Sequence, residues 1–123
     1  MASVTVTDDI ITVQFTGWER LWIGRERLAI PIAAVRHASA VAQPLRLAYG
    51  GRRGIAVSGF LKIGVWGLFG RTRQLVAARR GEPGLHLLLN REYAGGDFDE
   101  VVLSDPAGHK IAHAITRVMA ARA

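Results

Sequence analysis

The spacing of apolar residues changes once along this chain, and that change limits the fold more than any other feature. Upstream of Asp105–Pro106, apolar and β-branched residues alternate with polar ones, which is typical of strands with one buried face. Downstream, apolar residues recur every three or four positions, as on one face of a helix. We therefore expect short strands within about residues 3–104, followed by one helix over about 106–121. The residues that show the two patterns are Ile11, Val13 and Phe15 for the strands, and Ile111, Ala114, Ile115, Val118 and Arg122 for the helix.

Several connections can be assigned from local composition. Gly81–Gly84 and Tyr93–Gly96 have turn composition, and the Gly-rich segment 50–54 is expected to be a flexible basic loop. Residues 45–49 are expected to form a short strand. The apolar residues at 18, 21 and 22 are spaced for one helical turn or a tight loop whose apolar side lies on the core.

Composition fits a single domain spanning residues 1–123. Half of the 123 residues are hydrophobic and 21% are charged, which is ordinary for a globular chain. The absence of cysteine excludes disulfides and thiolate chemistry. The N-terminal residues lack the pattern of a secretory signal, and the longest apolar run is far shorter than the ~20 residues of a membrane span. These features favour a cytoplasmic protein, with peripheral membrane contact left open.

Basic residues are concentrated in the middle of the sequence. Between Arg36 and Arg91 there are ten Lys or Arg residues and one acid, Glu82. The net charge of the whole chain is +6. Such an excess favours anionic partners, namely nucleic acid, acidic lipid or an acidic protein, without choosing among them.

Four motifs follow one another along nearly the whole chain. They are Gly17-Trp18-Glu19-Arg20-Leu21, Leu28-x-Ile30-Pro31-x-x-x-Val35, the glycine-rich pair Gly59-Phe60 and Gly64-Val65-Trp66, and Val101-Val102-Leu103-Ser104-Asp105-Pro106. In this order they resemble the bacterial pleckstrin-homology-like (PH-like) domains, and the resemblance rests on the order more than on any one motif. One departure is the segment Gly51–Ile55, where the family is more regular.

The resemblance implies a mainly β fold with about seven antiparallel strands in a bent barrel, capped by one C-terminal α-helix. It also implies a binding module, because the wider fold binds lipid head groups, peptides or partner proteins, and some bacterial members look like ring-forming oligomers. Fold alone does not determine the ligand. In lipid-binding PH domains, basic residues near the first two strands hold phosphates. The candidate anion-binding residues here are Arg20, Arg25, Arg27, Arg52 and Arg53.

Two readings of these arginines stay open. Arg25 and Arg27 are two residues apart, so on a strand their side chains share a face and could reach one phosphate. Alternatively they lie on a solvated strand face, partly neutralised by Glu19 and Glu26.

A second candidate segment combines large apolar residues with glycines and arginines. It could dip into a membrane interface, form an oligomer surface, or be a core strand with its aromatic residues inside. The candidate contact residues are Trp66, Leu68, Phe69, Arg71 and Arg73.

Signals for catalysis, cofactors or metals are weak. His109 and His113 have the i, i+4 spacing of two metal ligands, but Lys110 stands where a zinc protease needs its glutamate. We expect no catalytic, metal or cofactor site. The sequence also disfavours nucleic-acid binding, because the only clear helix is amphipathic and is needed to close the core. The expected function is a non-enzymatic module that acts through protein contacts, including self-association. The first alternative is a peripheral binder of anionic phospholipid head groups, and the last is a small enzyme or nucleic-acid binder.

Overall fold

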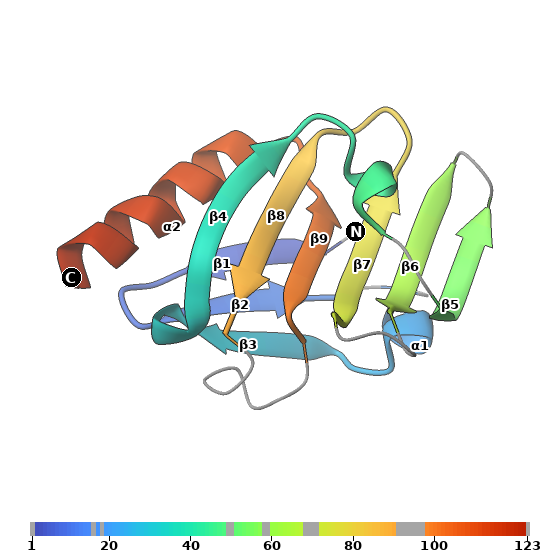
Figure 1. Cartoon of the computed structure of the whole chain (residues 1–123), viewed down its shortest axis with the longest axis horizontal. Helices are drawn as coiled ribbons and strands as arrows, with labels where there is room; N and C mark the ends of the chain where they lie inside the picture. Colours follow the sequence, from blue (N-terminus) through green and yellow to red (C-terminus); the bar gives the residue numbers. More distant parts are fainter. Residues whose placement is uncertain are drawn as a thin grey trace.

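The structure, a computed structural model, describes residues 2–15, 17, 19–48, 51–57, 60–67, 72–90 and 98–122. These residues form nine strands in two sheets and a long C-terminal helix (Figure 1). The smaller sheet contains β1 (Ser3–Val6), β2 (Ile10–Gln14) and β3 (Arg27–Pro31). The larger sheet contains β4 (Val35–Val41), β5 (Arg52–Val57), β6 (Leu61–Trp66), β7 (Gln74–Arg79), β8 (Gly84–Leu89) and β9 (Glu100–Ser104). The helices are α1 (Glu19–Ile23), the 3-10 turns η1 (Ile32–Ala34) and η2 (Pro44–Leu47), and α2 (Gly108–Arg122).

The two sheets differ from the single antiparallel barrel that the resemblance implies. The smaller sheet has the order β1-β2-β3, and the larger has the order β4-β8-β9-β7-β6-β5. All neighbours are antiparallel except β7 and β9, which run parallel from Gln74 beside Glu100 to Ala77 beside Leu103. The expectation of a mainly β chain with a C-terminal helix is confirmed. The described residues form nine strands where about seven antiparallel strands were expected, and the two sheets they form do not close into one barrel.

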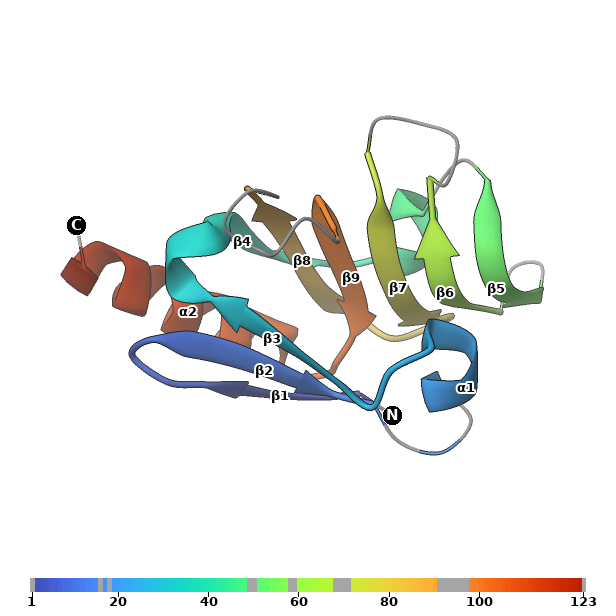
Figure 2. The same cartoon turned by 90° about the horizontal axis from the view of Figure 1, so that it is seen from below.

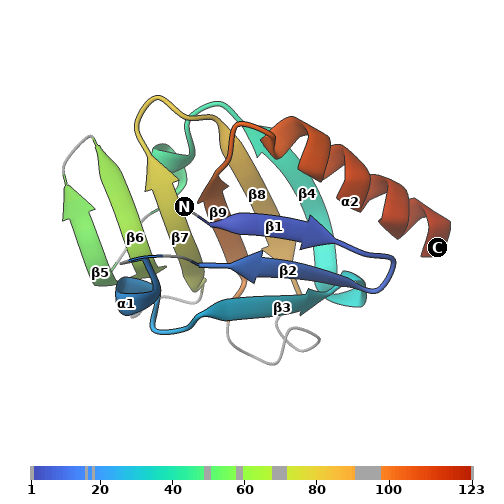
Figure 3. The ribbon, with the colours of Figure 1, turned by 180° about the vertical axis from the view of Figure 1, so that it is seen from behind.

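The main core lies between the two sheets, whose strands cross one another (Figures 2 and 3). The alternation read from the sequence decides which side chains enter it, because successive strand residues point to opposite faces. Ile11 and Val13 of β2 are fully buried, as are Leu85 and Leu87 of β8. Burying a side chain of this size stabilises the fold by about 1.5–3 kcal/mol.

Helix α2 covers the β4 end of the molecule, packing on β4, β8 and β1. Its apolar stripe includes Ile115, which is fully buried, and Ala112, which the sequence reading missed. The helix begins two residues later than expected. Asp105 still acts as a cap, since its Oδ1 accepts a hydrogen bond from the backbone N–H of Ala107 at 2.8 Å.

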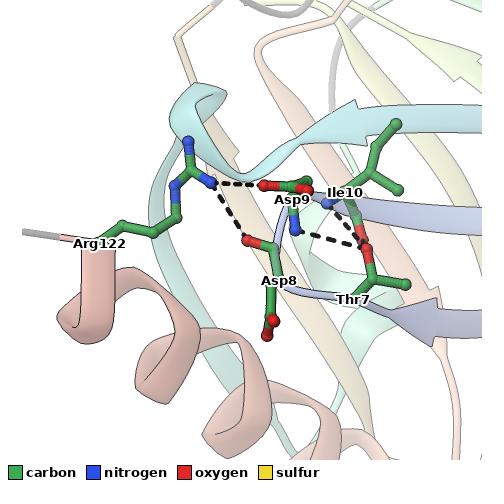
Figure 4. A network of polar contacts seen from close by, with 5 residues as sticks. All are labelled: Thr7, Asp8, Asp9, Ile10 and Arg122. Carbon is green, nitrogen blue, oxygen red and sulfur yellow. Dashed lines mark hydrogen bonds and ion pairs between the residues drawn. The ribbon is translucent and has the colours of Figure 1, made fainter.

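The C-terminal end of α2 is tied to the β1–β2 turn (Figure 4). Arg122 donates to the carbonyl of Asp8 at 3.2 Å and to Oδ1 of Asp9 at 3.0 Å. Thr7 fixes the same turn, because its Oγ1 accepts from the backbone N–H of Ile10 at 3.1 Å. The Arg122–Asp9 ion pair is largely exposed, so it orients the helix end and adds at most about 1 kcal/mol.

A second, smaller apolar cluster lies on the opposite face of the larger sheet. It contains Trp66, Val76 and Val102, and η2 covers it. Lys62 Nζ donates to the carbonyls of Leu45 and Ala48, at 3.0 and 3.3 Å, and Gln74 Nε2 donates to that of Leu47 at 2.7 Å. These bonds satisfy backbone oxygens that the short helical turn leaves without internal partners.

Two local predictions in this region are wrong. Pro44–Leu47 forms the 3-10 turn η2 where a strand over 45–49 was expected, and Tyr49 lies outside the described residues. Pro44 favours a helical first turn, and the following carbonyls are bound by side chains instead of a strand partner. The expected basic loop at 50–54 becomes strand from Arg52 onward, because β6 supplies a full antiparallel partner. The expected turn at Tyr93–Gly96 also lies outside the described residues.

Candidate functional site: the basic surface around helix α1

Helix α1 exposes the apolar residues that the sequence pattern predicts to be buried. Leu21 is 75% exposed and Trp22 is 37% exposed. Glu19 and Ile23, one turn apart, are the residues that face inward, each 2% exposed. The expected helical turn is therefore present, but its outer side is apolar. Trp18, the third residue of the pattern, is outside the described part of the chain.

This surface lies at the β5 edge of the larger sheet, opposite the β4 edge. Helix α1 packs against β5 and β6, and Figures 2 and 3 show it beside the ends of these strands. Gly24 ends the helix with a φ of +84°, a conformation that favours glycine. The backbone N–H of Gly24 donates to the carbonyl of Arg20 at 2.9 Å, which closes the turn.

Three of the five candidate arginines meet around α1. Arg20 forms an exposed ion pair with Glu26 at 3.5 Å. The Arg25 guanidinium lies 5.2 Å from the centre of the buried Phe98 ring, a cation–π contact. A terminal nitrogen of Arg53, from β5, lies 3.8 Å from the position a Cβ on Gly24 would occupy. Two segments far apart in sequence therefore bring basic groups to helix α1, Arg20 and Arg25 beside Leu21 and Arg53 near Gly24.

Among the described residues, no hydrogen bond, ion pair or cation–π contact links Arg27 or Arg52 to this group. Arg52 pairs with Trp66, so it points to the η2 face of the sheet, whereas Arg53 pairs with Val65 on the core face. Arg27 is exposed at the start of β3. Arg25 precedes that strand, so the prediction that Arg25 and Arg27 share a strand face is wrong. Strand β2, the partner of β3, ends at Gln14, which pairs with Arg27. Arg25 therefore lies outside the paired part of these two strands.

A shallow depression of about 510 Å³ lies at the centre of this surface. Arg20 and Arg25 provide its basic groups, Glu26 its carboxylate, and Leu21 an apolar side. Glycines 17 and 24 complete the lining without side chains. Among residues the structure describes, Arg53 makes no ion pair, so its charge is available to a partner.

Of the second candidate segment, the structure describes Trp66 and Arg73. Trp66 is 3% exposed and belongs to the cluster beneath η2, which favours the core alternative for this residue. Leu68, Phe69 and Arg71 lie outside the described residues. Arg73 is half-buried, and its backbone N–H donates to Oδ2 of Asp99 at 2.9 Å.

One basic cavity was not anticipated from the sequence. Arg46 of η2 and Arg79 and Arg80 at the end of β7 line a cavity of about 780 Å³. All three arginines belong to the basic middle segment of the sequence. Arg46 is far from Arg79 and Arg80 in sequence, so local patterns do not predict that η2 packs against β7. A polar pair, His86 Nε2 and Glu100 Oε1 at 2.6 Å, bridges β8 and β9 on the same face of the sheet.

Comparison with known proteins adds no relative: no family model, curated protein or solved structure matches the chain. None of the helices in the described ranges has the length and apolar character needed to span a bilayer.

Proposed function

We propose that this chain is a non-enzymatic binding module that docks on anionic phospholipid surfaces through α1. The observation that carries the proposal is the exposure of Leu21 in a depression that Arg20 and Arg25 also line, on a short helix that exposes Trp22 as well. Arg53 adds a third basic group near Gly24, where this helix ends. Apolar side chains enter the boundary between head groups and acyl chains, and arginines bind lipid phosphates. Tryptophan suits this boundary because its ring is apolar and its N–H is polar.

We also propose that the fold is a divergent form of the PH-like architecture. The run of strands followed by a single closing helix supports this proposal, and a binding role is consistent with it. The parallel β7–β9 pair and the separate three-stranded sheet are features that a PH-like relative would have to accommodate.

Charge reversal at α1 tests the membrane proposal. Arg20→Glu combined with Arg53→Glu should weaken binding to vesicles of phosphatidylcholine and phosphatidylserine by at least about tenfold, since each base near an anionic surface contributes about 1 kcal/mol. Co-sedimentation measures the binding. Raising salt should weaken it as well, because exposed charges are screened within ~10 Å at 0.1 M.

The matched control reverses two exposed arginines elsewhere, Arg36→Glu with Arg117→Glu, on β4 and α2. It changes net charge equally and should bind nearly as well as the unmodified chain. Equal losses in the two variants would mean that net charge, and not the α1 surface, attracts the vesicles. No preference for acidic over neutral vesicles at low salt would refute the proposal.

Self-association is the second candidate function, favoured by the position of β5. This strand ends the order of the larger sheet, so its outer backbone has no strand partner among the described residues, and Val57 is 45% exposed. Such edges pair readily with another strand. In an antiparallel β5–β5 pair, Arg52 would lie opposite Val57 of the second copy, which avoids arginine facing arginine. Light scattering at high micromolar concentration should then give twice the 13.4 kDa chain mass, and a 13.4 kDa species throughout excludes it.

A further inference from the structure

Glu26 places a carboxylate within the basic surface that we propose docks on the membrane. Its Oε1 lies 3.5 Å from a guanidinium nitrogen of Arg20. Both side chains are accessible, since 53% of Arg20 and 66% of Glu26 is exposed. Both residues line the depression of about 510 Å³ that Leu21 also lines. A group that binds Arg20 in this depression therefore also meets the Glu26 carboxylate.

Backbone hydrogen bonds hold the two residues of this pair in place. The N–H of Phe15 donates to the carbonyl of Glu26 at 2.9 Å, and the Phe15 side chain is buried in the main core. The carbonyl of Arg20 accepts from the N–H of Gly24 at 2.9 Å. The backbone of Glu26 cannot move away from the depression without breaking its bond to the core strand.

Docking through α1 brings the Glu26 carboxylate into the layer of lipid head groups. Leu21 lines the same depression, so its insertion moves Glu26 toward the lipid phosphates. A carboxylate there is repelled by phosphate and loses water that hydrates it in the free protein. A head group with a hydrogen-bond donor replaces that water, whereas a head group without one leaves the acceptor unsatisfied.

We infer that Glu26 selects among anionic phospholipids, in favour of phosphodiester head groups that carry a hydrogen-bond donor, such as the hydroxyls of phosphatidylglycerol. Arg20 binds the phosphate of such a lipid, because guanidinium and phosphate form two parallel N–H···O bonds. Glu26 accepts a hydrogen bond from a hydroxyl of the same head group. The 3.5 Å between the two side chains suits one small head group, whose phosphate and hydroxyls are joined by a short carbon chain. This selectivity rests on the proposed membrane docking and adds the chemical class of the lipid.

Phosphatidylglycerol and phosphatidylmethanol test this selectivity with the unmodified full chain. Both lipids are phosphodiesters with a single negative charge, and only phosphatidylglycerol has hydroxyls on its head group. Co-sedimentation uses vesicles that contain equal fractions of one or the other lipid in phosphatidylcholine. Binding to phosphatidylglycerol should be about three- to tenfold tighter, which is less than a hydrogen bond to a buried charge supplies, because Glu26 is exposed.

Glu26→Ala should abolish the preference, because the acceptor that reads the hydroxyl is gone. Binding to phosphatidylmethanol should rise by about fivefold, since one repulsive charge leaves the surface. The control, Asp8→Ala, removes an exposed acid from the β1–β2 turn. This turn lies beside the C-terminal end of α2 and away from α1 (Figures 3 and 4), so the control should keep the preference of the unmodified chain.

Two results would overturn this inference alone. One is equal binding of the unmodified chain to the two lipids, which would leave docking through α1 in place without selection by Glu26. The other is a preference for phosphatidylglycerol that survives Glu26→Ala, which would assign the hydroxyl to another acceptor. If the unmodified chain sediments with neither lipid, membrane docking fails and the selectivity fails with it.

Discussion

Replacing Gly84 with alanine should lower the free energy of unfolding by about 3 kcal/mol or more. Gly84 begins β8, and a Cβ there would lie 2.0 Å from the carbonyl oxygen of Leu103 on the paired strand. The same residue contacts the start of α2, because a Cβ on Gly108 would lie 2.5 Å from the Gly84 carbonyl oxygen. The nearest obstacles to a Cβ on Gly84 are backbone atoms of β9, with the Pro44 side chain 3.1 Å away, and β9 cannot shift without disturbing the main core.

Gly81→Ala is the control for this prediction, since it changes the same residue type three positions away. Gly81 has a φ of +81°, but a Cβ there meets nothing within 4 Å. It should cost only the conformational strain of about 1–2 kcal/mol. Thermal and denaturant unfolding measure both, and we expect Gly84→Ala to lower the Tm by about 10 °C or more. Equal losses of unfolding free energy in the two variants would mean that crowding of a Gly84 Cβ against Leu103 adds no cost.

Local pattern predicts most of the elements of this fold but not their partners. Alternating β-branched residues give β2, and the change of period gives α2, because both signals lie within one segment. The parallel pairing of β7 with β9 cannot be read locally, since it joins residues about 26 positions apart and β8 lies between them in sequence. The number of sheets follows from such long-range pairings.

The candidate site was predicted in part for the same reason. Arg20 and Arg25 lie near each other in sequence, so their grouping could be foreseen, whereas the approach of Arg53 depends on α1 packing against β5. The orientation of α1 was predicted wrongly, because the spacing of Leu21 and Trp22 defines an apolar face but does not decide whether it meets the core or solvent. Glu19 and Ile23 occupy the inward positions instead.

Insertion of Trp22 into anionic membranes is the prediction with the largest expected effect on binding. In the free protein Leu21 is mostly in water, and Trp22 is more than one third exposed. Burying side chains of this size gains about 1.5–3 kcal/mol each when they are fully removed from water. Electrostatic attraction by Arg20, Arg25 and Arg53 adds to this and brings α1 to the surface first. The two effects together should place the indole at the level of the head groups and upper acyl chains.

Fluorescence of Trp22 as the only tryptophan tests the central claim most directly. Trp18→Phe and Trp66→Phe leave Trp22 alone, and a control carries Phe60→Trp with residues 18, 22 and 66 as Phe, because Phe60 is 56% exposed but belongs to the β5–β6 connection. With anionic vesicles containing lipids brominated near the head group, we predict a blue shift and strong quenching of Trp22 emission, and little change at position 60. Unchanged Trp22 emission while the protein co-sediments with the vesicles would contradict docking through α1.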